Sequence, residues 1–139
     1  MKSFPPSQKK PIARSGIKRV NRKRRARNWA RAYHSEERVE FVNAMPCCAC
    51  GVIGYTENAH VPPKGEAGTG YKADAKWIVP LCGLRVERGS GSICLRSLGC
   101  HNVLHELGRA SFEKSWGIDL TSLAATVQEE WRAWKESQA

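Results

Sequence analysis

The chain has 139 residues, a length that suggests one domain with an appended segment. Its charge is unevenly distributed: residues 1–34 contain twelve Lys or Arg and no Asp or Glu, whereas residues 35–139 contain eleven basic and thirteen acidic residues. No apolar run reaches the roughly 18 residues that a membrane span requires, and no apolar segment follows the first basic residues as in a secretory signal. We therefore expect a cytoplasmic protein that does not enter a membrane.

The basic residues at the beginning of the chain predict a nucleic-acid-binding arm. Prolines and a glycine interrupt residues 1–23, so no regular element is expected there. A block of like charge repels itself, stays largely disordered alone and binds polyanions, of which nucleic acid is the commonest. We interpret residues 1–34 as this flexible arm; the alternatives are a solvated tail and a nuclear-localisation signal. The candidate phosphate-binding residues are Arg22, Lys23, Arg24, Arg25 and Arg27, with Lys72 from a later loop.

Residues 35–139 show the patterns of a small α+β domain. Ser35, followed by Glu36 and Glu37, is typical of a helix start. Residues 57–61 predict a short strand and WIVPLC, residues 77–82, a buried one, and the loop between them is rich in glycine and proline. Alternating apolar residues on either side of a Gly-Ser turn predict a hairpin over residues 84–96.

Three helices are expected after the hairpin. The first begins near His101 and ends at Gly108, the second ends at Gly117, and the last begins after a cap at Asp119 or Thr121. The last helix carries an apolar stripe that we expect to pack in the core, namely Leu123, Val127, Trp131 and Trp134.

Six cysteines allow either disulfides or a metal site. Without a secretory signal a reducing compartment is expected, and there paired cysteines more often bind metal. Cys47 and Cys50 form a C-x-x-C pair, and a structural zinc needs two further ligands. A hairpin between residues 83 and 99 would return the chain to its start and place Cys100 beside Cys82. The predicted structural Zn²⁺ ligands are Cys47, Cys50, Cys82 and Cys100; Cys94 is the alternative to Cys100, and Cys48 is expected to point elsewhere.

Three histidines accompany these cysteines. His60 lies on the first predicted strand, and His101 and His105 are four residues apart, so they share one face of a helix. The order PCCACG, ENAHV, a glycine-rich loop, KADAKWIVPLC, CHNVLH and GRASFEKSWGIDL resembles the HNH, or ββα-metal (His-Me finger), endonucleases. It is most similar to the short zinc-stabilised kind encoded by phages and prophages, which includes the recombination-enhancing nucleases. The resemblance covers residues 45–120.

The resemblance implies a ββα-metal core with a structural zinc and flanking helices in residues 35–139. It implies that His60 is the general base, and that His101 and His105 bind Mg²⁺ or another catalytic divalent ion. A neutral imidazole accepts a proton near pH 7, and the ion stabilises charge on the phosphate and the leaving oxygen. The family usually has Asp or His where this chain has Ala59. Either Asn58 or Asp74 then takes that role, or His60 is itself a ligand.

Two functions follow as hypotheses. The first is a metal-dependent endonuclease that hydrolyses DNA phosphodiester bonds in phage-type recombination or DNA processing. The alternative is a non-catalytic, zinc-containing nucleic-acid-binding module with an eroded HNH site. DNA is the expected partner in both, and the sequence names no recombination or replication protein that would accompany it.

Overall fold

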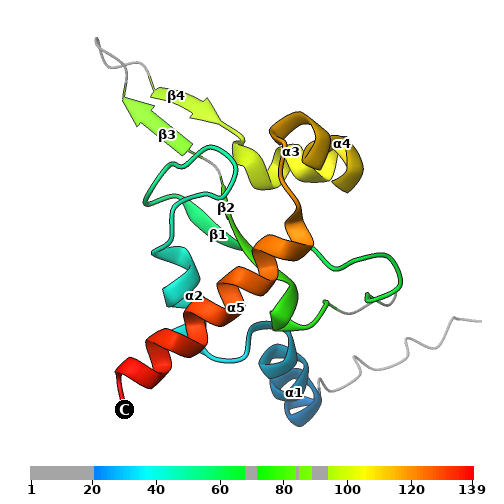
Figure 1. Ribbon diagram of the computed structural model, residues 1–139, viewed down its shortest axis with the longest axis vertical. Helices are drawn as coiled ribbons and strands as arrows, with labels where there is room; N and C mark the ends of the chain where they lie inside the picture. Colours follow the sequence, from blue (N-terminus) through cyan, green and yellow to red (C-terminus); the bar gives the residue numbers. More distant parts are fainter. Residues whose placement is uncertain (1–20, 68–71, 84, 89–93) are drawn as a thin grey trace, which may run out of the picture.

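The computed structural model describes residues 21–67, 72–83, 85–88 and 94–139 (Figure 1). Within these residues it is a small mixed α/β structure with two separate antiparallel sheets of two strands each. The elements in chain order are α1 (Arg22–Tyr33), α2 (Glu36–Asn43), β1 (Thr56–His60), the 3₁₀ turn η1 (Ala75–Trp77), β2 (Ile78–Cys82), β3 (Arg85–Arg88), β4 (Cys94–Ser97), α3 (Gly99–Leu107), α4 (Arg109–Trp116) and α5 (Leu120–Ser137).

The centre of the structure is the pair β1 and β2. The strands are antiparallel, and their register pairs Thr56 with Cys82 and His60 with Ile78. All five residues of β2 are buried, because helices α3 and α5 pack against this strand. The short strand and the buried strand expected from the sequence are therefore confirmed.

The second sheet is a hairpin that leaves the body of the molecule. β3 pairs with β4 in antiparallel fashion, with Arg85 opposite Ser97 (Figure 1). The expected hairpin is thus confirmed, although its turn lies outside the described residues. Its two ends bring the chain that leaves β2 back to the start of α3.

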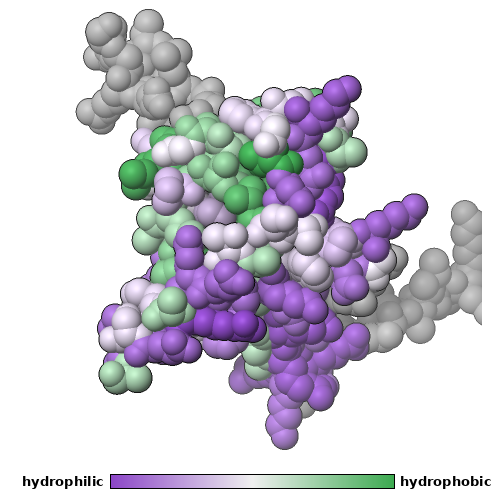
Figure 2. All heavy atoms as spheres, in the orientation of Figure 1, coloured by the Kyte–Doolittle hydropathy of each residue, from purple (hydrophilic) through white to green (hydrophobic). Residues whose placement is uncertain are grey.

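Helix α1 lies in the segment that the sequence assigns to a flexible arm. The Asn21 side chain caps the helix by accepting a hydrogen bond from the Arg24 amide, and Ala32 is buried against the body. Hydrophilic side chains cover the end of the molecule that carries this helix (Figure 2). Residues 22–33 are therefore part of the packed structure, and residues 1–20 lie outside the part of the chain that is described.

Helix α2 begins as its sequence predicts, because the Ser35 hydroxyl accepts a hydrogen bond from the Arg38 amide. Val42 is buried. Arg38 is also buried, which no local pattern indicated. Its Nη2 donates to Oε1 of Gln128 on α5 at 2.9 Å, a pairing between residues 90 positions apart.

The three helices after the hairpin end and begin where the sequence predicts. Gly108 follows α3, Gly117 adopts the left-handed conformation after α4, and the Asp119 side chain caps α5. The face of α5 that enters the core consists of Leu120, Ala124, Val127 and Trp131. Two residues of the predicted stripe are therefore fully buried, while Leu123 and Trp134 lie half-buried at its edge.

None of the helices in the described segments combines the length and the apolar character needed to cross a membrane.

Candidate functional site

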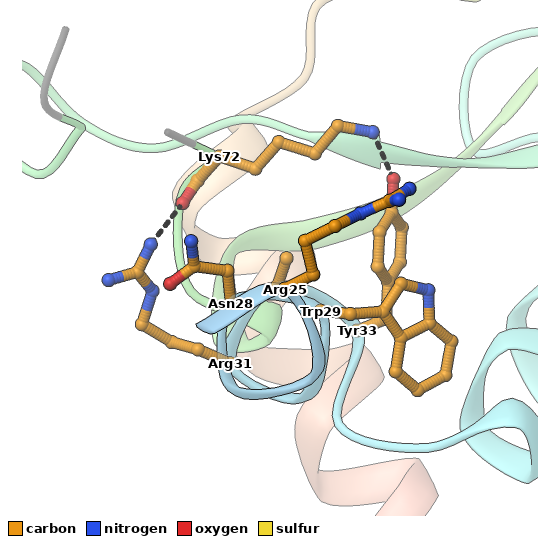
Figure 3. A pocket seen from close by; sticks show the side chains of 7 residues that line it. Arg25, Asn28, Trp29, Arg31, Tyr33 and Lys72 are labelled. Atoms are coloured by element: carbon orange, nitrogen blue, oxygen red, sulfur yellow. Dashed lines mark hydrogen bonds between the residues drawn. The ribbon is translucent and has the colours of Figure 1, made fainter. Parts of the chain in front are cut away.

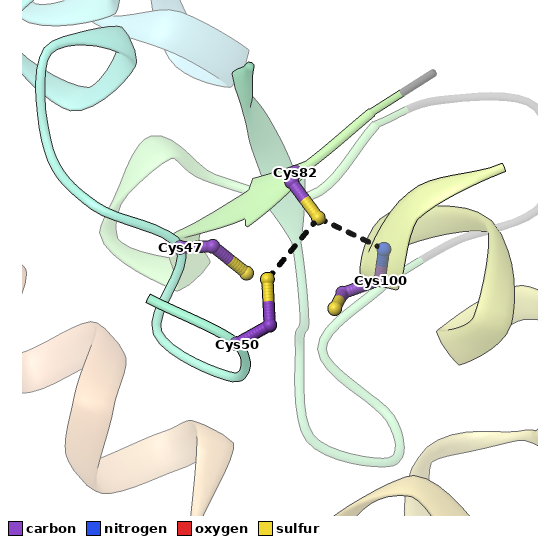
Figure 4. A group of neighbouring side chains, drawn as sticks. All are labelled: Cys47, Cys50, Cys82 and Cys100. Carbon is purple, nitrogen blue, oxygen red and sulfur yellow. Dashed lines mark hydrogen bonds between the residues drawn. The ribbon is translucent and has the colours of Figure 1, made fainter. Parts of the chain in front are cut away.

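Four cysteines come together at one end of the sheet. Cys47 and Cys50 lie in the turn after α2, Cys82 ends β2 and Cys100 begins α3 (Figure 4). Their sulfur atoms all lie within 4.8 Å of one another. The Sγ atoms of Cys50 and Cys82 are 3.7 Å apart, and two thiolates that each bind zinc at about 2.3 Å in a tetrahedron are separated by about 3.8 Å. The cluster could therefore hold a metal such as zinc.

Backbone geometry holds this cluster in place. The Cys100 amide donates to Cys82 Sγ at 3.2 Å, and the Gly51 amide donates to the Cys47 carbonyl at 2.9 Å, which closes the C-x-x-C turn. Gly99 has a φ of 79°, and a Cβ atom at this position would lie 2.1 Å from the Gly83 carbonyl oxygen. Only glycine therefore allows α3 to start so close to the end of β2. In the sequence, the only signal of this requirement is the glycine directly before Cys100.

The thiols of Cys47, Cys82 and Cys100 differ in acidity. Burial opposes ionisation of Cys47, but amide groups of Cys50, Cys82 and Ala49 surround its sulfur and lower its pKa to about 7. Burial raises the pKa of both Cys82 and Cys100. Several negative charges so close together repel one another, so a bound cation is what would let all four ionise.

Cys48 and Cys94 were expected not to bind the metal. Cys48 packs against the core, and burial raises the pKa of its thiol to about 12. It is not a member of the cluster. The side chain of Cys94, on β4, lies outside the described part of the chain, so the expectation for Cys94 stays a prediction. Among the described residues, Cys100 is the fourth member of the cluster.

The histidines line a different space. An open cavity of about 340 Å³ lies between β1, the following loop and α3, and its wall includes His60, His101 and His105, with Asn58 and Lys72 beside them. His101 and His105 lie one helical turn apart, and their Nε2 atoms are separated by 3.2 Å. Two nitrogens bound to one ion at about 2.1 Å with a tetrahedral angle lie about 3.4 Å apart. The pair therefore has a spacing that suits two ligands of one divalent ion.

Glu57 on β1 orients His101, and the sequence analysis did not single it out. The carboxylate oxygen Oε2 accepts a hydrogen bond from His101 Nδ1 at 2.7 Å. Because Nδ1 then carries the proton, Nε2 of the neutral ring presents its lone pair toward His105. A carboxylate that holds the second nitrogen of a histidine in this way is typical of metal-binding histidines. Its only sequence signal is that it is the one carboxylate on the strand.

His60 is held by a backbone contact from α1. Its Nε2 lies 2.6 Å from the Ala32 carbonyl oxygen, which can only accept, so Nε2 carries a proton and Nδ1 of the neutral ring is free to accept one. Burial lowers the pKa of His60 below its ordinary value, and the charge of Lys72 lowers it further. The ring is therefore neutral at pH 7.

Asn58 and Asp74, the expected substitutes for a ligand at position 59, have other partners. Ala59 is fully buried in the core. Asn58 Nδ2 donates to the Val39 carbonyl and to the Asn43 side chain, and Asp74 accepts from the Lys76 amide at the start of η1. Asn58 nevertheless lines the histidine cavity, whereas Asp74 does not.

The candidate nucleic-acid-binding residues fall into two groups. Most of them are exposed on α1, namely Arg22, Lys23, Arg24, Arg25 and Arg27. Lys72 lies beside the histidine cavity, where its Nζ donates to the Tyr33 hydroxyl. The structure thus brings one predicted phosphate ligand to the three histidines and leaves the others on a neighbouring helix.

Comparison of the chain with protein-family models, with curated proteins and with solved structures found no match.

Proposed function

We propose that this protein is a metal-dependent endonuclease that hydrolyses DNA phosphodiester bonds, and that its four-cysteine cluster is a structural zinc site. The observation that carries the proposal is the histidine cavity. It combines a neutral, half-buried histidine, a pair of histidines at metal-ligand spacing and a lysine in one open space. This is the set of groups that phosphodiester hydrolysis requires.

His60 is the general base in this proposal. Its Nε2–H is fixed by the Ala32 carbonyl, so Nδ1 is the atom that takes the proton from an attacking water. The lowered pKa supports this role, because a base must be unprotonated to act. The rigid position of the ring between β1 and α1 keeps Nδ1 in one direction.

His101 and His105 are the metal ligands. A divalent ion bound by them would stabilise the charge that develops on the phosphate and on the leaving oxygen. Glu57 fixes the tautomer of His101, and Lys72 brings a positive charge to the same cavity for the phosphate group.

A second candidate is a non-catalytic nucleic-acid-binding module that keeps the cysteine cluster. Ala59 favours it, since a buried alanine supplies no ligand atom where the family usually has one. In this case the cysteines would still hold zinc and α1 would still bind nucleic acid, but no metal ion would promote cleavage.

Cleavage of supercoiled plasmid DNA separates the two functions. The wild-type protein is incubated with Mg²⁺, Mn²⁺ or Zn²⁺ in parallel with His60→Ala and His105→Ala. We expect nicking by the wild type and a loss of at least about a hundredfold in both variants, the lower end of what a general base contributes. The fourth histidine, His34, is exposed and outside the cavity, and it has a φ of 69°; His34→Asn, which tolerates this backbone, is the matched control and should cut normally.

The zinc content of His105→Ala must also be measured. One tightly bound zinc per chain should remain, because the structural ion uses cysteines alone. No cleavage by the wild type with any of the three ions would leave the non-catalytic module as the function.

A further inference from the structure

Helix α1 presents an aromatic face next to a basic one. Arg25, Trp29 and Tyr33 follow one another at intervals of four residues, so they lie along one side of the helix. The rings of Trp29 and Tyr33 have centroids 5.6 Å apart at an interplanar angle of 35°. Trp29 is 41 % exposed, which is unusual for the largest apolar side chain when it has a core nearby to enter.

These residues form a second pocket. It has a volume of about 340 Å³ and is lined by Arg25, Asn28, Trp29, Arg31, Tyr33 and Lys72 (Figure 3), together with Ala32. Lys72 Nζ lies 4.8 Å from the centroid of the Tyr33 ring, and Arg31 Nη2 donates to the Lys72 carbonyl at 3.3 Å. These lining residues include three cationic side chains and two aromatic rings and no carboxylate.

The pocket adjoins the histidine cavity. Lys72 lines both spaces. Ala32, which also lines the pocket, is the residue whose carbonyl holds His60, and the rings of Tyr33 and His60 meet edge to face with centroids 5.2 Å apart. A molecule seated on Trp29 and Tyr33 would therefore be a direct neighbour of a group bound at the histidines.

We propose that this pocket binds an unpaired nucleobase of a DNA strand, stacked on Trp29, while Arg25 and Lys72 contact the phosphates on either side. The inference rests on the proposed function, since it names the class of substrate: single-stranded or locally unpaired DNA. Aromatic rings accept any base whose faces are free, whereas in a duplex both faces are covered by neighbouring pairs. The cationic side chains of the pocket suit the negatively charged phosphates of a DNA backbone. Because Lys72 lines both spaces, a strand bound in the base pocket would continue past Lys72 into the histidine cavity.

The test is equilibrium binding of a fluorescein-labelled twelve-nucleotide oligo(dT) by fluorescence anisotropy, with no divalent ion added and at fixed salt. Stacking on an aromatic side chain contributes about 1–3 kcal/mol per base, so Trp29→Ala should weaken binding about fivefold to a hundredfold. Trp29→Phe keeps an aromatic face and should recover most of the affinity. Trp116→Ala is the matched control, because Trp116 is 42 % exposed on α4 and is absent from both spaces.

A twelve-base-pair duplex provides the second readout. Trp29→Ala should bind this duplex as the wild type does, because duplex binding depends on phosphate contacts. Equal affinity of Trp29→Ala and the wild type for the single strand, an equal loss on single strand and duplex, or no wild-type binding of oligo(dT) would each overturn the proposal. The outcome is independent of plasmid cleavage. If the wild type does not cleave plasmid DNA, but Trp29→Ala binds the single strand more weakly than the wild type does, the nuclease proposal is refuted and the base-pocket proposal is supported.

Discussion

Replacing Cys50 by serine tests the metal centre most sharply, because Cys50 is the exposed member of the cluster. An exposed side chain contributes little to packing, and surface substitutions usually change stability by less than about 0.5 kcal/mol. A structural zinc in a small domain contributes about 10–16 kcal/mol, which is as large as the whole net stability of a typical domain, roughly 5–15 kcal/mol. If the cluster holds zinc, Cys50→Ser should therefore abolish tight zinc binding and the cooperative thermal transition.

Cys48 offers the matched control two residues away. Its side chain is more buried than that of Cys50, and a buried hydroxyl without a partner costs about 1–3 kcal/mol. On burial alone, Cys48→Ser would be the more harmful substitution. With a metal at the cluster the order is reversed, and Cys48→Ser should keep one zinc per chain and melt cooperatively at a somewhat lower temperature.

Both proteins can be compared by their zinc content after gel filtration and by circular dichroism during heating. The expected result is one zinc and a sigmoidal melt for the wild type and Cys48→Ser, and neither for Cys50→Ser. A Cys50→Ser protein that is soluble, free of zinc and cooperatively folded would refute the assignment. So would a greater loss of stability in Cys48→Ser.

Three further predictions concern the histidines and the basic segment. Glu57→Gln should weaken binding of the proposed catalytic ion about tenfold to a hundredfold. This is measured as an increase in the Mn²⁺ concentration that half-saturates cleavage, and high Mn²⁺ should restore the rate. An unchanged half-saturating concentration would show that Glu57 does not orient His101. Because burial lowers the pKa of His60, single-turnover cleavage should persist as the pH falls below 6.5, the ordinary histidine pKa, and should disappear only below the lowered pKa of His60. Loss of cleavage already above pH 6.5 would contradict a lowered pKa of the general base. Deleting residues 1–20 keeps the Asn21 cap of α1 and removes six cations. On duplex DNA, the slope of log affinity against log salt should become shallower by about 0.9 for each lost phosphate contact, which is about 3 if half of the six cations bind. An unchanged slope would mean that these cations do not contact DNA.

The elements that the sequence predicted share one property: their signals are local. Ser35 before two glutamates, Gly117 after a helix and the apolar run of residues 78–82 each determine the conformation of their own segment. The cysteine cluster could also be predicted, although Cys82 and Cys100 are 18 residues apart, since an antiparallel hairpin must return to its start. The periodicity of α5 was predicted, while the exact centre of its buried face was not.

What the sequence could not predict depends on pairings between distant segments. Arg38 is charged and would be placed on the surface by any local rule, yet Gln128 meets it in the interface of α2 and α5. Glu57 became important only because β1 lies beside the start of α3. In the same way, the base-stacking role proposed for the exposed Trp29 depends on the position of α1 next to Lys72 and His60. No spacing along the chain encodes these three contacts.

The position of the cysteines explains how a structural metal would act on the histidine cavity. The cluster joins the turn after α2, the end of β2 and the start of α3, so an ion there would fix three segments relative to one another. Cys100 is followed directly by His101, and Cys82 is paired in register with Thr56, the neighbour of Glu57. A shift of α3 against the sheet by one ångström would therefore break the 2.7 Å contact between Glu57 and His101 before it disturbed the apolar core. The spacing of a metal-binding pair tolerates errors of only a few tenths of an ångström. It follows that a loosening of the cysteine cluster that still leaves the domain folded should impair the histidine pair first.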